Sequence, residues 1–266
     1  MRTRHSIIIP AYNEAGRIAE TLESVAAFLK TDRAEGTDWE VIVVCDGCTD
    51  ATAQVAGTFA DSLPLQVSGY SNNRGKGYAV RQGVAVSNGD IVTFMDADGS
   101  TPVRELDRLS VPIRNRQADI VIGSRRAEGA TVTAGQSIFR QFLGRAFAHH
   151  SRIVLGLDVR DTQCGFKVFR GTMARALFAG LRCDGFAFDL ELLAEARERG
   201  LRVLERGVEW RETPGSTVRP LRDGIRMLRA AWQIRSSLQT RRRTCRRGPF
   251  EAPVPLPEPL YKGCPS

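Results

Sequence analysis

The sequence predicts an α/β protein with a mainly parallel β-sheet flanked by helices. Short apolar runs alternate along the chain with segments whose apolar residues recur at helical spacing. The runs are apolar at successive positions rather than at every second one, which is typical of strands buried on both faces of a parallel sheet. With 266 residues and a hydrophobic content of 42%, the chain is large enough for one sizeable domain.

The first half of the chain shows this alternation most regularly. We expect strands at residues 6–9, 40–44, 65–67 and 91–95, and helices at 14–30, 50–59 and 77–87. In the first of these helices, Ile18, Leu22, Val25 and Leu29 share one face. Because a helix follows each of the first three strands, these strands are expected to run parallel, with the helices covering the sheet.

The second half is predicted to continue the sheet and to end in an amphipathic helix. We expect strands at 118–122, within 161–169 and at 202–208, and helices at 136–157, 186–199 and about 221–238. The last helix carries an apolar stripe beside a cationic one, formed by Leu221, Ile225, Leu228 and Trp232 and by Arg222, Arg226 and Arg229. The chain is interpreted as one domain at 1–240 and a tail at 241–266, basic and then Pro-rich, which we expect to be disordered.

The charge balance favours an anionic partner. Lys and Arg number 38 against 30 Asp and Glu, a formal net charge of +8. Nucleotides, phosphates, nucleic acids and anionic membrane surfaces all fit such a chain. The basic run at 241–247 keeps nucleic-acid binding as an alternative, but no helix-turn-helix, zinc finger or aromatic RNA-binding motif accompanies it. We therefore expect no nucleic-acid partner.

The chain shows neither an export signal nor a spanning segment. The first residues lack a signal peptide's apolar region and cleavage site, and no apolar run approaches the roughly 20 residues of a membrane-spanning helix. We expect a cytoplasmic protein, soluble or peripheral to a membrane, with its six cysteines reduced. Cys45 and Cys48 form a C-x-x-C pattern, but a zinc site would need a second such pair; a redox role is the remaining alternative.

Polar, Gly-rich loops follow each of the first four predicted strands. Their sequences are PAYNEAG, CDGCTD, SNNRGKG and DADGSTP. The carboxyl ends of parallel strands lie at one edge of a sheet, where ligands of such sheets bind. The convergence of four such loops predicts a ligand site at this edge.

The fourth loop places Asp96 and Asp98 directly after a buried strand. Alternate side chains of an extended segment point the same way, so both carboxylates can face one hard cation. Mg²⁺ and Mn²⁺ take oxygen ligands of this kind together with substrate phosphates. The alternative is a capped turn, because Ser100 or Thr101 before Pro102 also signals a helix start.

The second and third loops carry candidate contacts to a nucleotide. Asp46 lies at a strand end, where its carboxylate could accept an N–H group from a base. Arg74 and Lys76 precede a helix, whose first N–H groups favour an anion, although a basic surface turn would have the same composition. The loop is not a Walker A motif, and no G-x-G-x-x-G follows the first strand.

Several of these motifs resemble a known family. PAYNE, CDGCTDAT, NRGKGYAVRQGV and MDADGSTP are similar to successive motifs of family 2 inverting glycosyltransferases with the GT-A fold. GSRR, DTQCGFKVFR, DGFAFDLELL and VEWRETPGSTV resemble the subgroup that charges polyprenyl phosphates, closest to dolichyl-phosphate β-glucosyltransferases, with the corresponding mannosyltransferases as near relatives. The resemblance runs from about residue 7 to 238. It implies a Rossmann-like GT-A fold with a nucleotide-sugar half at about 1–126 and an acceptor half at about 127–240.

The resemblance also implies roles for individual residues. The nucleotide-binding positions are Pro10, Ala11, Tyr12, Glu14, Asp46, Lys76, Asp96 and Ala97. The metal ligands are Asp96 and Asp98, with Ser100 where a third ligand can occur. The catalytic positions are Asp98, Arg125 near the phosphates, and Asp189 where related enzymes keep a general base. Cys45 and Cys48 depart from the usual Asp and Ser, which could alter the base preference.

The function implied is transfer of a hexose, with glucose expected, from a UDP-sugar to polyprenyl or dolichyl phosphate with Mg²⁺ or Mn²⁺. Two alternatives remain open: a GDP-mannose donor, and a soluble alcohol acceptor for which Asp189 would act as base. A lipid acceptor requires a membrane surface, and we expect peripheral association at its cytoplasmic face. The last helix could lie in that interface or pack on the domain with a solvated basic face.

Overall fold

The computed structural model describes residues 3–31, 37–133, 148–213 and 220–245. Several predicted features lie outside these residues: the first part of the 136–157 helix, the loop at 214–216, and the tail from residue 246. Within the last helix, the side chains of 220–225 and 241–245 are likewise outside the description.

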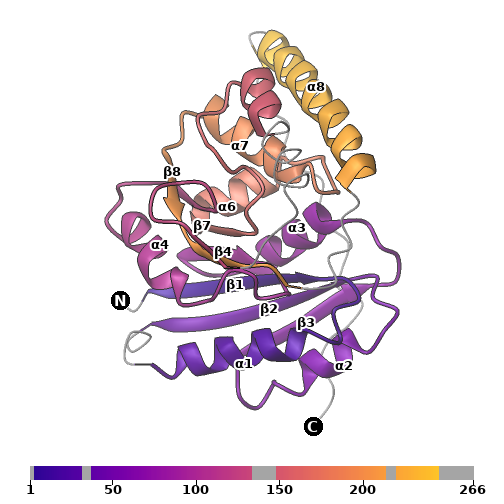
Figure 1. Ribbon diagram of the computed structural model, residues 1–266, viewed down its shortest axis with the longest axis vertical. Helices are drawn as coiled ribbons and strands as arrows, with labels where there is room; N and C mark the ends of the chain where they lie inside the picture. Colours follow the sequence, from indigo (N-terminus) through magenta and orange to yellow (C-terminus); the bar gives the residue numbers. More distant parts are fainter. Residues whose placement is uncertain (1–2, 32–36, 134–147, 214–219, 246–266) are drawn as a thin grey trace.

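A seven-stranded sheet forms the centre of the molecule, in the order β3-β2-β1-β4-β7-β5-β8 (Figure 1). The strands are β1 (Arg4–Ala11), β2 (Asp38–Asp46), β3 (Leu65–Tyr70), β4 (Ile91–Met95), β5 (Ile120–Ser124), β7 (Phe166–Arg170) and β8 (Val203–Gly207). All neighbours pair in parallel except β7, which is antiparallel to both β4 and β5. The predicted mainly parallel sheet is confirmed. A small parallel pair, β6 (Thr131–Thr133) and β9 (Glu209–Arg211), lies apart from it.

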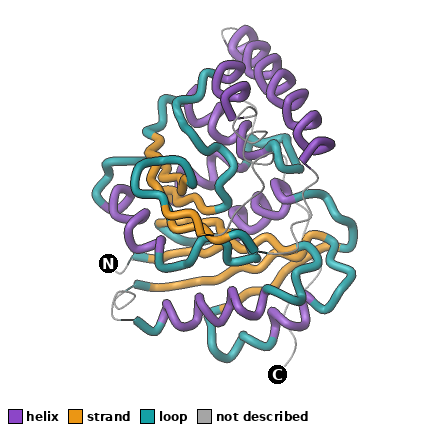
Figure 2. Tube along the Cα trace, viewed as in Figure 1, coloured by secondary structure: helices purple, strands orange, loops and turns teal. Residues whose placement is uncertain are grey.

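Helices cover both faces of the sheet (Figure 2). The helices are α1 (Ile18–Leu29), α2 (Thr52–Gly57), α3 (Lys76–Val86), α4 (Glu105–Arg114), α6 (Gly171–Phe178), α7 (Phe188–Glu198) and α8 (Pro220–Cys245); residues 148–155 are also helical. One core contains side chains of α1, α2 and α4, and the other contains those of α3, α6, α7, α8 and residues 148–155. Neighbouring strand residues alternate between these cores, so Ile7 and Ile9 face one and Ile8 faces the other.

Four phenylalanines form the part of the core that lies beneath α6 and α7. Phe94, Phe169, Phe178 and Phe188 have ring centroids 5.6 to 6.5 Å apart. All four side chains are fully buried. Edge-to-face and offset ring pairs add stability beyond the buried area alone. Because Phe188 is the first residue of α7, this cluster fixes where that helix begins.

Two helices have no explicit counterpart in the predicted elements. The signal near Pro102 indicates a helix start, but Pro112 inside α4 reads as a helix breaker in sequence. The second helix, α6, is a short segment that begins at Gly171 directly after a strand. Packing against the sheet stabilises both segments beyond what their local sequence indicates.

The last helix differs from its prediction in length and in its buried face. It extends to Cys245, so residues 241–245 are helical where we expected the start of a disordered tail. The side chains that enter the core are Ala231 and Ile234, whereas Trp232, assigned to the apolar stripe, is 55% exposed. The helix packs against α7, which selects the 231–234 face over the stripe drawn through Trp232. The helix therefore packs on the domain, as one of the two alternatives expected. Its opposite face is exposed, so the structure does not exclude the other alternative, contact of that face with a membrane.

Candidate active site

The first four strands bring their loops together at one edge of the sheet, as predicted. Ala11 pairs with Cys45 and Asp46 pairs with Tyr70 in the parallel register, so three strands end side by side. The first two loops are joined because the backbone N–H of Thr49 donates to Asn13 Oδ1 at 2.8 Å. The strand pairing and this hydrogen bond bring residues that are far apart in sequence together at the same edge of the sheet.

The PAYNE loop places a carboxyl group beside the aspartate loop. Pro10 and Ala11 are buried, and Tyr12 is exposed at the rim. Glu14 is held by its backbone N–H, which donates to Thr52 Oγ1 at 2.8 Å, and by an ion pair with Arg17 at 2.6 Å. Burial raises the pKa of Glu14, and the nearby negative charges of Asp98 and Asp96 raise it further against the effect of Arg17. Glu14 therefore belongs to the same electrostatic cluster as the aspartates.

Asp46 organises the neighbouring loop rather than standing open to solvent. Its carboxylate accepts hydrogen bonds from the backbone N–H groups of Arg74 at 2.7 Å and Gly75 at 2.8 Å, and from Asn73 Nδ2 at 3.1 Å. Gly75 has a φ of 108°, a conformation that glycine adopts easily. An aspartate with three donors is well anchored, so Asp46 fixes the shape of the loop that leads into α3.

Lys76 lies directly against the aspartate pair. Its Nζ is 2.5 Å from Asp96 Oδ1. Burial lowers the pKa of Lys76, but the carboxylates of Asp96, Asp189 and Asp98 outweigh that effect and raise it above its ordinary value. The third loop thus supplies a fixed positive charge to the fourth, and the basic-surface-turn alternative does not describe this lysine.

Asp98 shows the capped-turn arrangement, one of the two alternatives that the sequence left open; its role as a metal ligand stays a prediction. Its Oδ1 accepts the backbone N–H of Ser100 at 2.9 Å, which is the capped-turn arrangement. Ser100 is buried, with its Oγ 3.3 Å from Thr213 Oγ1, and Ala97 is buried between the two aspartates. No group of three His, Cys, Asp or Glu residues in the described parts of the chain is arranged to hold a metal. Two carboxylates and a hydroxyl form an oxygen donor set that fits Mg²⁺ or Mn²⁺ when substrate phosphates complete it.

A glycine in the DTQCGFK segment makes room for the aspartate loop. The backbone N–H of Asp96 donates to the carbonyl oxygen of Gly165 at 3.0 Å. A Cβ atom at residue 165 would overlap the Asp96 carboxylate. The turn before β7 therefore sets the position of Asp96, a function that sequence reasoning did not assign to Gly165.

Arg125 follows β5 and is held by a buried carboxylate. Its Nε and Nη2 donate to the two oxygens of Asp161 at 2.7 and 2.8 Å. Burial opposes ionisation of Asp161, but Arg125 outweighs it and lowers the pKa of this carboxyl to about 2. The guanidinium also lies 5.5 Å from the ring centroid of Trp210. Arg125 is thus fixed in orientation, and Asp161 is a partner that the sequence did not reveal.

Asp189 lies in the first turn of α7 and is paired with a lysine that sequence reasoning missed. Lys167 Nζ donates to Asp189 Oδ1 at 2.7 Å, and both side chains are buried. Burial raises the pKa of Asp189, and this effect exceeds the lowering by Lys167 and Lys76. The available signal was a lysine inside the apolar strand FKVFR, where a charged residue is unusual without a partner.

A further cluster connects the third loop to the segment before α7. Asp184 forms ion pairs with Arg74 at 3.3 Å and with Arg81 at 2.6 Å. Arg74 also lies 3.6 Å from the ring centroid of Tyr78. The loop shaped by Asp46 is therefore tied to the start of the helix that carries Asp189.

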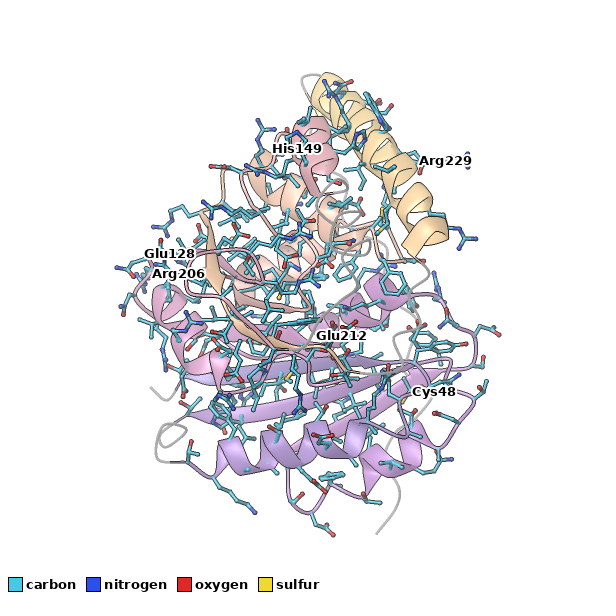
Figure 3. The ribbon with its side chains drawn as sticks, viewed as in Figure 1. Cys48, Glu128, His149, Arg206, Glu212 and Arg229 are labelled. Atoms are coloured by element: carbon cyan, nitrogen blue, oxygen red, sulfur yellow. The ribbon has the colours of Figure 1, made fainter. Side chains whose placement is uncertain are left out.

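Cys45 and Cys48 occupy the second loop as free thiols. Cys48 Sγ is 3.3 Å from the carbonyl oxygen of Ala11, and Figure 3 shows Cys48 close to α2. A hydrogen bond from Cys45 is the largest influence on Cys48 and lowers its pKa to about 7. The pair therefore offers one thiol with thiolate character beside the PAYNE loop.

Comparison with known proteins identifies relatives across most of the chain. The model of glycosyl transferase family 2 matches residues 6–178. A dolichyl-phosphate beta-glucosyltransferase of Drosophila melanogaster is 38% identical over 240 residues, covering 86% of this chain and 73% of that protein. The protein of the same name from Saccharomyces cerevisiae is 32% identical over 240 residues, covering 84% and 71%.

Solved structures of glycosyltransferases share the fold. Glucosyl-3-phosphoglycerate synthase from Mycobacterium tuberculosis, in complex with Mn²⁺, UDP and glucosyl-3-phosphoglycerate, superposes with a TM-score of 0.64 at 22% identity, covering 90% of this chain and 80% of that one. Mannosyl-3-phosphoglycerate synthase from Rubrobacter xylanophilus superposes with a TM-score of 0.64 at 20% identity, covering 95% and 79%. These structures agree with the GT-A-like sheet. On the family match and the identity to these relatives, the chain belongs to glycosyltransferase family 2.

Proposed function

We propose that this enzyme transfers a hexose, with glucose as the expected sugar, from a UDP-sugar to a polyprenyl or dolichyl phosphate. The observation that carries the proposal is the fixed contact of Lys76 with Asp96 at the edge where four strand-end loops meet. A diphosphate leaving group needs positive charge on one side and a carboxylate-bound divalent ion on the other. The dolichyl-phosphate beta-glucosyltransferases that resemble this chain support the choice of sugar and acceptor.

In the proposed reaction an oxygen of the acceptor phosphate attacks the anomeric carbon of the sugar. The bond from that carbon to the diphosphate oxygen breaks, and its electron pair leaves with UDP. Lys76 stabilises the developing negative charge. Asp96, Asp98 and Ser100 would hold Mg²⁺ or Mn²⁺, which would supply further positive charge to the diphosphate. The acceptor phosphate is already anionic at neutral pH, so no proton has to be removed from it.

The remaining site residues take binding roles in this proposal. Pro10, Ala11, Tyr12 and Glu14 border the nucleoside, with Ala97 at the floor between the aspartates. Asp46 supports the nucleotide site by fixing the loop at Arg74 and Gly75, whose backbone N–H groups donate to its carboxylate. Arg125, oriented by Asp161, contributes positive charge near the phosphates.

We further propose that the exposed face of α8 and the helix at 148–155 contact the cytoplasmic face of a membrane. Ile153 is 66% exposed and Trp232 is 55% exposed, and Arg226 and Arg229 are exposed on the same helix as Trp232. Figure 3 shows Arg229 on the outer side of α8. Exposed aromatic and basic side chains together favour an interfacial position on anionic lipid. Among the described helices, none has the length and hydrophobicity to cross a bilayer.

The proposal is tested by incubating the purified protein with a short polyprenyl phosphate, Mn²⁺ or Mg²⁺, and labelled UDP-glucose or GDP-mannose in parallel. We expect label to enter the organic phase from UDP-glucose. Asp98→Ala should reduce this by about 10²–10³-fold, because a proposed ligand of the divalent ion that stabilises the leaving group is lost. Asp61→Ala, an exposed aspartate in the turn before β3, is the matched control and should retain full transfer.

Other outcomes distinguish the alternatives. Transfer from GDP-mannose alone would keep the lipid acceptor and replace the donor. UDP release that depends on a soluble alcohol rather than on the lipid phosphate would contradict the proposed acceptor. That result would instead favour Asp189 as a base, for which its burial and raised pKa are suited.

A further inference from the structure

Lys167 is a buried cation in the middle of a central strand. Its side chain is fully buried in β7, and its register partners are Phe94 in β4 and Ile122 in β5. Its Nζ lies 5.1 Å from the ring centroid of Phe94. A lysine at such a position replaces an apolar side chain that would pack there without any desolvation cost. Its presence therefore needs an explanation beyond folding of the sheet.

The lysine has two acceptors, one of which is the candidate base. Nζ donates at 2.7 Å to the carbonyl oxygen of Cys164 and at 2.7 Å to Asp189 Oδ1. The carbonyl belongs to the DTQCGFK turn, which also places Gly165 against Asp96. Lys167 consequently connects the turn that shapes the aspartate loop with the carboxylate at the start of α7.

Charged groups reach Asp189 from three elements. Lys167 in β7 and Lys76 in α3 lower the pKa of Asp189, and Asp96 in the loop after β4 raises it; Lys167 is in direct contact with the carboxylate. Lys76 is in turn bound to Asp96. Positive and negative charges therefore alternate from Lys167 through Asp189 and Lys76 to Asp96. Because Lys167 forms the ion pair with Asp189, Lys76 forms its ion pair with Asp96 in the aspartate loop.

We propose that Lys167 is a positioning residue for the transfer reaction, which holds the Asp189 carboxylate ionised and aimed at the acceptor side of the aspartate loop. This inference rests on the proposed function. It assigns to Lys167 the role of keeping Asp189 in the charged form that, together with Asp96, stabilises the ammonium group of Lys76. Lys167 binds Oδ1 of the carboxylate and acts through Asp189 rather than on the substrate.

The direction of the pH effect follows from the surroundings of Asp189. Burial raises the pKa of its carboxyl, and Lys167 is the first of the groups that oppose this rise. Without Lys167 the pKa of Asp189 rises further. The ionised carboxylate of Asp189 acts by its charge on Lys76 rather than as a base, because the acceptor phosphate needs no deprotonation. Activity is therefore present above the pKa of Asp189 and is lost as the pH falls through it, so the loss begins at higher pH in a variant without the lysine. An opposite charge in contact typically changes such a pKa by about 1–3 units.

The test compares Lys167→Met with Phe169→Leu, a core change on the same face of the same strand that alters no charge. We expect Lys167→Met to lower kcat for transfer, with little change in UDP affinity, and to move the acidic limb of the pH profile upward by about 1 unit or more. Phe169→Leu should lower Tm and leave the acidic limb where it is. Carbon-13 NMR titration of the Asp189 carboxyl, assigned with Asp189→Asn, should show the same upward change without any substrate.

A double variant separates positioning from folding. Lys167→Met alone leaves a buried carboxylate unpaired, whereas Lys167→Met with Asp189→Asn removes both charges and should recover the fold. In the Asp189→Asn background, loss of Lys167 should lower kcat no further, because Lys167 acts through Asp189.

Three results would overturn the inference. They are an unchanged Asp189 titration in Lys167→Met, additive losses of kcat in the double variant, and failure of the double variant to fold. If instead the wild-type protein transfers no sugar from either donor, the proposed function fails. The NMR titration would still decide whether Lys167 controls Asp189.

Discussion

Two regions of the sheet, the proposed donor half around β1 to β4 and the proposed acceptor half around β7, supply their site residues in different ways. Around β1 to β4 all strands are parallel, and the residues of interest lie in the loops directly after the strand ends. Around β7 the pairing is antiparallel, and Lys167 lies within the strand while Asp189 comes from the first turn of a helix. The site residues of the donor half thus lie in loops at one edge of the sheet, whereas those of the acceptor half lie within the core.

The charged side chains of the two halves also differ in exposure: those at the edge of the sheet are partly exposed, and those within the core are buried. The Asp96 side chain is 32% exposed, although Lys76 contacts it, so it can still receive a ligand. Lys167 and Asp189 have side chains 0% and 4% exposed and are already paired. Partly exposed charges at an edge change partners readily, whereas breaking a buried pair leaves an uncompensated charge. This difference supports the proposal that the donor half binds and releases a diphosphate, while the paired charges of the acceptor half stay fixed.

The largest effect is expected at the junction of the two halves, from Gly165→Ala. The added Cβ would overlap the carboxylate of Asp96, which must then move away from Lys76. We expect transfer to fall by about 10²–10³-fold, as for loss of a preorganised electrostatic contact, and metal-dependent UDP binding to weaken. Isothermal titration with UDP and Mn²⁺, alongside the transfer assay, measures both.

Gly57→Ala provides the matched control for this change. A Cβ at Gly57 in α2 meets no atom within 4 Å, so the variant should retain activity and gain up to about 1 kcal/mol of stability. Wild-type UDP binding in Gly165→Ala would show that the β7 turn does not position Asp96. The donor half would then hold Asp96 without help from the turn before β7, which would contradict the proposed junction between the two halves.

A smaller effect is expected from Asp46→Asn within the donor half. The amide keeps one oxygen acceptor in place of two, so the backbone N–H of Arg74 or of Gly75 loses its partner. Leaving such a group unsatisfied costs about 1–3 kcal/mol, which corresponds to UDP binding weakened by about 10-fold if the loop contacts the nucleotide. Titration calorimetry with UDP measures the change, with Asp61→Asn as the control. Equal UDP affinity in Asp46→Asn and wild type would show that this loop is not part of the donor site.

The contrast between the halves also explains what the sequence could predict. Asp96, Asp98 and Lys76 follow or precede elements with clear patterns, and the parallel topology alone brings their loops to one edge. Their meeting at that edge therefore needed no knowledge of side-chain packing.

The region around β5 and β7 depends on pairings that no local pattern encodes. Lys167 and Asp189 are 22 residues apart, and Arg125 and Asp161 are 36 apart. The antiparallel insertion of β7 between β4 and β5 decides both contacts. The apolar stripe that includes Trp232 differs from the buried face of α8 for a related reason. Packing against α7 buries Ala231 and Ile234 instead, which lie on a different face from the one that the spacing favoured.

A moderate effect is expected at the outer surface of the acceptor half, from Arg226→Gln with Arg229→Gln. Both side chains are exposed on α8, and a basic residue near an anionic lipid surface contributes about 1 kcal/mol, or about 5-fold in affinity. We expect the double variant to bind phosphatidylserine vesicles more weakly at low salt, with UDP binding unchanged. Sedimentation with vesicles measures this, and Arg114→Gln with Arg116→Gln at the end of α4 is the charge-matched control. Equal loss in both double variants would indicate an effect of net charge rather than of the α8 face.

The smallest effect on function is expected at Cys48, which tests how open the donor edge is compared with the acceptor core. The pKa of Cys48 is lowered to about 7, chiefly by the hydrogen bond from Cys45, whereas burial raises the pKa of Cys164 and of Cys183 to about 12. Because the thiolate is the nucleophile, iodoacetamide should modify Cys48 first among these three, with a rate that rises through about pH 7. Peptide mass spectrometry at several pH values measures the three rates.

UDP should slow the modification of Cys48, because this thiol lies against the carbonyl oxygen of Ala11 in the proposed nucleoside loop. Cys48→Ser should keep transfer within a factor of about 2–3, since a hydroxyl can donate to the same carbonyl. Modification that rises only above about pH 8.5, the range of an ordinary thiol, would show that Cys45 does not support the thiolate. Cys164 reacting as fast as Cys48 would contradict the distinction between an open donor edge and a closed acceptor core, since Cys164 lies buried in the turn that Lys167 holds.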